Sequence, residues 1–238
     1  MLLFYVRHGD PIYHPDSLTP LGKRQAEAVG HRLAQFGLDR VYASTSTRAV
    51  ETAQPTCEML KIEPILLDWC QEHYTFKQLH MVNAEGKRTW MFQNAEMRRF
   101  FNSEEIRRLG KEWYRHERFA GSTYEEGMER IRRESDAFLA ELGYVHLEDL
   151  NCYRVERPND ERVALFAHQG FGLALLSCML DIPYPMFSSH FDFGHSSVTV
   201  IEFADEEGYC VPRVLQLAND GHLWRDGVPT NYQNRLRF

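Results

Sequence analysis

The chain has 238 residues, 43% of them hydrophobic and 26% charged, and a formal net charge of −7 at pH 7. This length fits one large domain or a domain with an insertion. The negative net charge argues against nucleic acid as the main partner. A negative net charge is still compatible with a local basic pocket.

The five cysteines are scattered and include no CxxC pair. Their odd number and spacing favour a reducing compartment over a disulfide framework or a structural zinc site. The start, MLLFYVRHGD, lacks the charged region and the small-residue cleavage site of a signal peptide. No stretch approaches the roughly 18 apolar residues of a membrane helix. We therefore expect a cytoplasmic protein that does not contact a membrane.

Strand and helix patterns alternate from the first residues onward. The short apolar run at 2–8 predicts a buried strand. A helix is predicted over 19–37, because Thr-Pro is typical of a helix start and glycine of a helix end. RVYAS at 40–44 predicts a second strand, and Thr47 is expected to cap a second helix that continues to residue 60.

The same alternation returns after the middle of the chain. Residues 64–72 are a candidate third strand and 162–170 a fourth, followed by an apolar helix over 171–181. The β-branched runs at 196–204 and 211–219 predict two closing strands. This order predicts an α/β fold: a three-layer α/β/α sandwich with a mostly parallel central sheet.

Residues 73–120 break this rhythm with a charged and aromatic block that shows no obvious strand. Its segment 95–119 reads as helical, and 123–143 forms another amphipathic helix. We predict a single domain over 1–238 that carries a helical cap insertion at 73–120. Its aromatic residues are expected mainly to pack the cap, with an oligomer contact through the cap as another use for them.

Charged and imidazole side chains are predicted at several strand ends. They are Arg7, His8, Arg48, Glu72 and His168. Because ligands of open α/β sheets bind at the carboxyl ends of the strands, these side chains should point into one crevice. Two arginines and two histidines make an anion site, since the planar guanidinium matches phosphate oxygens. Helix N-termini after Ser46 and Gly170 are expected to add backbone N–H donors.

The chain resembles the histidine phosphatase superfamily, the group that includes the phosphoglycerate mutases. RHG ends the first predicted strand, and DSLTPLGKRQAEAVG, YASTSTRAVETA and ALFAHQGFG follow in the family's order. HSSVTVIEF and LANDGHL are similar to its closing strands, so the anchors run from residue 2 to residue 223.

The resemblance implies a role for each site residue. His8 would be the nucleophile that takes the phosphoryl group, and Arg7, Arg48 and His168 would bind its oxygens. Glu72 would protonate the leaving oxygen and then activate water. Gly9 would let the backbone approach the phosphoryl group. Because arginine and histidine supply the positive charge, neither a metal nor another cofactor is implied.

Three functions remain open on the sequence. The leading one is a phosphatase for a small phosphomonoester; the others are a phosphoglycerate mutase and a non-catalytic module that binds a phosphorylated ligand or a protein. Asp68 and Glu85 are alternatives to Glu72 as the acid. The part of the substrate beyond the phosphate would meet the cap, where the candidate cations are Arg98, Arg99, Arg107, Arg108 and Lys111.

One further cluster combines residue types that bind metals. His190, Asp192 and His195 lie close together in sequence, but their spacing matches no metal motif. We interpret the segment as a loop that leads into a strand, with His195 a candidate for the rim of the phosphate crevice.

Overall fold

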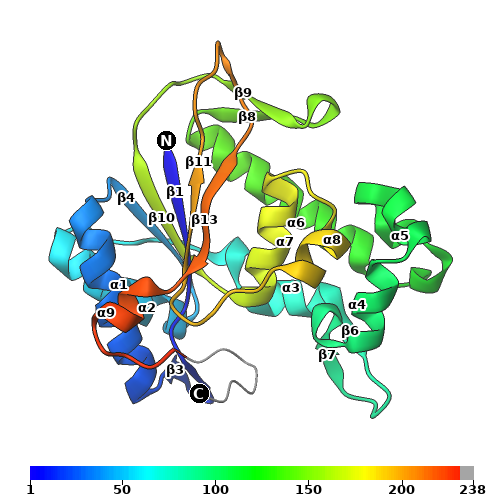
Figure 1. Cartoon of the computed structure of the whole chain (residues 1–238), viewed down its shortest axis with the longest axis horizontal. Coiled ribbons are helices and arrows are strands. Elements are labelled where there is room, and N and C mark those ends of the chain that lie inside the picture. Colours follow the sequence, from blue (N-terminus) through cyan, green and yellow to red (C-terminus); the bar gives the residue numbers. More distant parts are fainter. Residues whose placement is uncertain (231–238) are drawn as a thin grey trace.

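The computed structural model describes residues 1–230. Its central sheet has six strands in the order β13-β11-β1-β10-β4-β5 (Figure 1). Their bounds are β1 (Leu2–Arg7), β4 (Arg40–Ser44), β5 (Ile65–Leu67), β10 (Arg162–Ala167), β11 (Val198–Glu202) and β13 (Arg213–Asn219). Strands β1, β10, β4 and β5 pair in parallel, whereas β11 pairs antiparallel with β1 and with β13. The mostly parallel sheet is therefore confirmed.

Helices cover both faces of this sheet. Their bounds are α1 (Pro20–Phe36), α2 (Thr47–Leu60), α6 (Tyr124–Glu141), α7 (Gln169–Met179), α8 (Tyr184–His190) and α9 (Gly221–Arg225). Along β1, Phe4 and Val6 join the apolar cluster of α1 and α2, whereas Leu3 and Tyr5 join the cluster of α6 and α7. A strand buried on both faces needs apolar residues in succession, which explains the unbroken run at the start of the chain.

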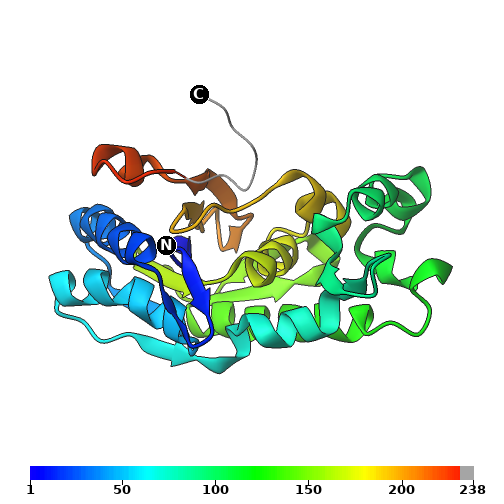
Figure 2. The same ribbon diagram turned by 90° about the horizontal axis from the view of Figure 1, so that it is seen from below.

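The inserted block forms a hairpin as well as helices, so its prediction as purely helical is wrong. Its elements are α3 (Glu72–Leu79), β6 (His80–Val82), β7 (Arg88–Trp90), α4 (Ala95–Phe101), α5 (Glu104–Leu109) and short 3₁₀ turns at Met91–Gln93, Gly110–Arg115 and Glu117–Phe119. The helix expected over 95–119 is divided because the Ser103 side chain caps a new helix and Gly110 takes a positive φ of 56°. Figure 2 shows α4 and α5 at the opposite end of the molecule from α1 and α2.

The aromatic residues of the cap pack mostly against one another. Trp113 is fully buried, and its ring contacts those of Phe101, Phe119, Tyr124 and Tyr184. This confirms their main predicted use, because the cluster packs the cap against α6 and α8 and is continuous with the apolar core on one face of the sheet.

Three local predictions differ from the structure. The expected strand over 64–72 keeps only β5, and after a 3₁₀ turn at Asp68–Cys70 the chain enters α3. The cap residue of α2 is Ser46, with Thr47 the first helical residue. Two small sheets were not expected: the hairpin of β2 (Pro11–Tyr13) and β3 (Asp16–Leu18), and the sheet of β8 (Tyr144–Leu147), β9 (Cys152–Val155) and β12 (Tyr209–Cys210).

Within residues 1–230, no helix is both long and apolar enough to span a bilayer.

Candidate active site

A cavity of about 520 Å³ opens at the carboxyl ends of β1 and β4. It is lined by Arg7, His8, Tyr13, His14, Arg48, Glu72, His73, Phe76, Trp90, Gln93 and Gln169. Four of the five predicted strand-end residues therefore line one cavity. The fifth, His168, lies directly behind it, with its ring centre 5.3 Å from that of His8.

The end of β1 holds His8 as a neutral nucleophile would need to be held. The backbone N–H of His8 donates to Ala167 O at 2.9 Å, which fixes the strand end against β10. Its Nδ1 lies 2.7 Å from Gly9 O, so Nδ1 carries the proton and the lone pair is on Nε2. Burial, with His168 and Arg7 nearby, holds the pKa of His8 well below its ordinary value, so the imidazole is uncharged at neutral pH.

Two guanidinium groups flank His8. Arg7 is almost fully buried, and burial lowers its pKa from the ordinary value. Arg48, in the first turn of α2, donates from Nη1 to Asp16 at 2.7 Å and from Nη2 to His168 Nδ1 at 3.1 Å. Among residues 1–230, the buried Nε of each arginine has no hydrogen-bond partner. Buried guanidinium N–H groups with unused hydrogen-bonding capacity make this a suitable site for an anion.

His168 is placed to hold Arg48. Because arginine only donates, His168 Nδ1 accepts the Arg48 bond and its Nε2–H points to Ser44 Oγ at 2.9 Å. The ring is fully buried, and burial beside Arg48 and Arg7 holds its pKa well below the ordinary value. In this arrangement His168 acts on the cavity through its contacts with Arg48 and His8.

Glu72 is the first residue of α3, and its side chain reaches the N-terminus of α7. Its two carboxylate oxygens accept the backbone N–H groups of Gly170 at 2.9 Å and Phe171 at 2.8 Å, at the N-terminus of α7. The α7 donors expected after Gly170 are thus taken by this carboxylate. Burial raises the pKa of Glu72, while these two hydrogen bonds and Arg48 oppose the shift. A carboxyl with a raised pKa beside a nucleophile is suited to acid–base work.

A family model described as the histidine phosphatase superfamily (branch 1) matches residues 3–214. The chain belongs to this superfamily. The match covers most of the described chain and includes the strands of the central sheet apart from Leu2 of β1 and most of β13.

The chain also resembles two known proteins over a short stretch of sequence. The chain is 46% identical to the mouse and 44% identical to the human serine/threonine-protein phosphatase PGAM5, mitochondrial, over 59 residues. That stretch is 21% of this chain and only 20% of the relatives' length. It therefore adds local sequence similarity, and the activity of the whole relatives is not carried over by it.

Solved structures share the fold over nearly the whole chain. A mycobacterial glucosyl-3-phosphoglycerate phosphatase has a TM-score of 0.58 at 19% identity, covering 91% of this chain and 98% of that one. A phosphoserine phosphatase from Entamoeba histolytica, in complex with 3-phosphoglyceric acid, has a TM-score of 0.59 at 17% identity, covering 93% and 98%. At this identity the similarity shows the α/β fold of these phosphatases.

Gly9 is required by packing. A Cβ at this position would lie 2.6 Å from the carbonyl oxygen of Gly22 in α1, and a Cβ on Gly22 would lie 2.2 Å from Asp10 O. The loop after β1 and the start of α1 thus approach backbone to backbone. This contact explains the glycine without the phosphoryl approach expected from the resemblance.

The alternative acids lie elsewhere. Asp68 accepts hydrogen bonds from Thr45 and Tyr74 on the surface, and Glu85 pairs with Lys87 in the β6–β7 turn. Neither lines the cavity that holds His8. Of the three carboxylates considered, only Glu72 does.

The candidate cap cations also lie away from the cavity. None of Arg98, Arg99, Arg107, Arg108 and Lys111 belongs to its lining among residues 1–230. Arg108 pairs with Glu104, and Lys111 pairs with Asp181. The cap contributes His73, Phe76, Trp90 and Gln93 instead. Phe76 and Trp90 belong to the aromatic residues of the block, whereas nothing in the sequence pattern distinguishes His73 or Gln93.

The three residues considered as metal ligands turn to different partners. His190 contacts Asn102, Asp192 accepts from Gln169, and His195 lies against Arg7. The expected position of His195 near the crevice agrees with this contact.

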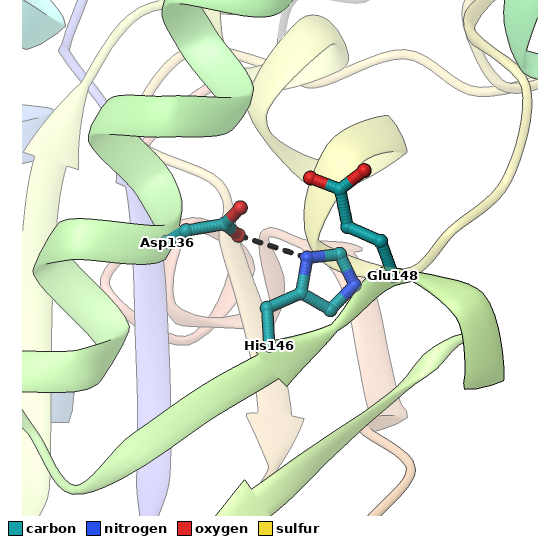
Figure 3. A group of neighbouring side chains, drawn as sticks. All are labelled: Asp136, His146 and Glu148. Carbon is teal, nitrogen blue, oxygen red and sulfur yellow. Dashed lines mark ion pairs between the residues drawn. The ribbon is translucent and has the colours of Figure 1, made fainter.

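A second group of titratable side chains lies away from the cavity, between α6 and β8. Figure 3 shows Asp136, His146 and Glu148, with the ion pair of His146 Nδ1 and Asp136 at 3.0 Å. Nε2 of His146 lies 3.0 Å from Asp181. These two carboxylates raise the pKa of His146 to about 9 against the opposing effect of burial. The ring is therefore an imidazolium that ties α6 to the loop after α7.

Proposed function

We propose that this protein is a phosphatase that hydrolyses a small phosphomonoester through a phosphohistidine on His8. The observation that carries the proposal is the environment of His8: a neutral imidazole with a free Nε2 lone pair, between two guanidinium groups and in one cavity with Glu72. The superfamily membership and the phosphatase fold of the solved relatives support the same reaction class.

The first step forms a bond between His8 Nε2 and phosphorus and breaks the bond between phosphorus and the substrate oxygen. The leaving oxygen takes the proton of Glu72, whose raised pKa favours the protonated form. Arg7 and Arg48 offset the charge on the equatorial oxygens, which is the main requirement of phosphoryl transfer. His168 holds Arg48 in place during this step.

The second step returns the enzyme to its starting state. Glu72, now ionised, takes a proton from water as the water oxygen attacks phosphorus. The bond between phosphorus and Nε2 breaks, inorganic phosphate leaves, and the Gly9 carbonyl holds the Nδ1 proton throughout. The charges that stabilise both steps come from side chains of this chain, so the scheme calls on no metal or other cofactor.

The test uses purified protein with p-nitrophenyl phosphate and excess chelator. We expect phosphate release, and its loss in His8→Ala. His31→Ala is the matched control, because this histidine is half exposed and lies on α1 with a partner at Asp226. Full activity of His8→Ala would exclude His8 as the nucleophile.

Labelling separates phosphatase from binding module. A substrate carrying ³²P should leave acid-labile label on the wild type during turnover and none on His8→Ala. A module that only binds would acquire no label. A panel of sugar phosphates, nucleotides, phosphoglycerates and phosphoamino acids then identifies the substrate, and a requirement for bisphosphoglycerate would favour a mutase.

A further inference from the structure

The segment Phe193–Ser197 wraps around the end of β1. It precedes β11, the strand that pairs with β1 in the sheet. The Ser196 N–H donates to His8 O at 3.1 Å, and Ser197 O accepts from the Arg7 N–H at 3.2 Å. The backbone of Arg7 and His8 is therefore fixed from this side.

The same segment also holds the Arg7 side chain. Nη1 of Arg7 donates to the carbonyl of Phe193, and Nη2 lies 2.9 Å from Nε2 of His195. The His195 side chain is only 9% exposed, and its ring centre lies 5.7 Å from that of His8. One imidazole thus touches the guanidinium and lies beside the nucleophile.

The hydrogen bond between Arg7 and His195 fixes the protonation state and tautomer of His195. Arginine has only donors, so Nε2 of His195 must accept and the ring proton must be on Nδ1. Nδ1 lies 3.4 Å from Asp10, whose carboxylate also accepts from Thr19 Oγ1 at 2.7 Å. Burial, together with Arg7, lowers the pKa of His195 to about 4, which agrees with a neutral ring.

We propose that His195 is a positioning residue, which holds the Arg7 guanidinium in the orientation that binds the phosphoryl group. The inference rests on the proposed function. An arginine side chain loses considerable rotamer freedom on binding, so a contact that orients it beforehand removes that loss from the reaction.

The choice of imidazole matters for the charge of the site. A carboxylate at position 195 would also accept from Arg7, but it would neutralise the guanidinium. A neutral imidazole accepts the hydrogen bond and leaves the full positive charge for the phosphoryl oxygens. His195 is thus suited to orient Arg7 without weakening its attraction for phosphate.

The experiment is a double-mutant cycle measured as kcat/KM on p-nitrophenyl phosphate. His195→Phe keeps a buried ring without an acceptor and should lower kcat/KM about 10- to 100-fold, the range for a hydrogen bond to a charged group. His195→Gln restores an acceptor and should recover most of the loss. In Arg7→Ala/His195→Phe the loss should match that of Arg7→Ala alone, because His195 acts through Arg7.

Two results would overturn the proposal. One is a His195→Phe variant, folded by its circular dichroism and melting temperature, with kcat/KM within threefold of wild type. The other is multiplication of the two single losses in the double variant. Should His195→Phe not fold, His195→Gln decides: no measurable rise of its activity above that of Arg7→Ala would contradict the acceptor role.

Orthovanadate keeps this test separate from the proposed function. Calorimetric titration measures its binding as a phosphate mimic whether or not the protein turns over substrate. If the wild type binds vanadate but does not hydrolyse p-nitrophenyl phosphate, the proposed phosphatase function is rejected. Weaker vanadate binding by His195→Phe would still support the positioning of Arg7, and unchanged binding would contradict it.

Discussion

Replacing Glu72 by glutamine tests the acid–base role with little change in shape. Both carboxylate oxygens are in use, since Gly170 N–H donates to one at 2.9 Å and Phe171 N–H to the other at 2.8 Å. Glutamine offers one acceptor oxygen, and its NH₂ group would face a second N–H donor. The variant therefore loses a proton donor and also one hydrogen bond at the N-terminus of α7.

The two losses have different sizes and different readouts. An unpaired buried N–H costs about 1–3 kcal/mol, which should appear as a lower free energy of unfolding. Loss of proton donation should lower kcat/KM by about 10²- to 10⁴-fold on an alkyl phosphate, whose leaving oxygen is strongly basic. On p-nitrophenyl phosphate the loss should be under about tenfold, since p-nitrophenolate leaves without protonation.

The assay is kcat/KM of wild type and Glu72→Gln on glycerol 2-phosphate and on p-nitrophenyl phosphate. This constant reports the steps up to phosphoryl transfer, so slow hydrolysis of the phosphoenzyme does not obscure the comparison. Glu85→Gln is the control, since Glu85 is exposed in the β6–β7 turn and should behave as wild type. Equal losses on the two substrates would refute the assignment of Glu72 as the acid.

Three further predictions concern packing and pH. Gly9→Ala places a Cβ 2.6 Å from Gly22 O and should destabilise the protein by about 1–3 kcal/mol in urea unfolding, whereas Gly221→Ala, with its nearest atom at 3.4 Å, should be nearly neutral. Because the pKa of His146 is raised to about 9, its ion pairs should stabilise the fold below pH 6.5 by about 1–2 kcal/mol after solvent screening, and progressively less as the pH rises through 9, so the pH-dependent part of the stability difference from His146→Gln should vanish above that pH. Because the pKa of His8 is lowered, kcat/KM corrected for substrate ionisation should show no acid limb near pH 6.5, and a limb there would contradict a neutral buried nucleophile.

The sequence alone indicated the strands of the central sheet and, from their ends, four of the eleven residues that line the cavity. Strands buried on both faces must be apolar throughout, which makes β1 and β10 conspicuous. Parallel strands direct their carboxyl ends to one edge, so Arg7, His8 and Arg48 could be brought together without coordinates. The strand-end pattern also included His168 and Glu72, the resemblance to the family implied their roles, and the structure places both at or directly behind the same cavity.

Local pattern failed for very short strands and for elements that depend on distant partners. Strands β6 and β7 have three residues each and, among residues 1–230, pair only with each other, so neither has a periodicity long enough to recognise. The pattern of 64–72 predicted a single strand and therefore missed the start of α3 at Glu72. The Glu72 side chain is fixed by the N-terminus of α7, about a hundred positions later. Helix ends and short strands of this kind are decided by tertiary contacts.

What the sequence determined by itself is which groups are available at the strand ends: an imidazole and two guanidinium groups, carried at the ends of buried strands or just after them. Only the tertiary structure decided the protonation state and the side-chain orientation of these groups. Gly9 O selects the lone pair of His8, His168 holds Arg48, and His195 holds Arg7 from a segment almost 190 residues away. The physical reason is that protonation and side-chain direction follow from burial and from hydrogen-bond partners, and both are set by packing between segments that are remote in the chain.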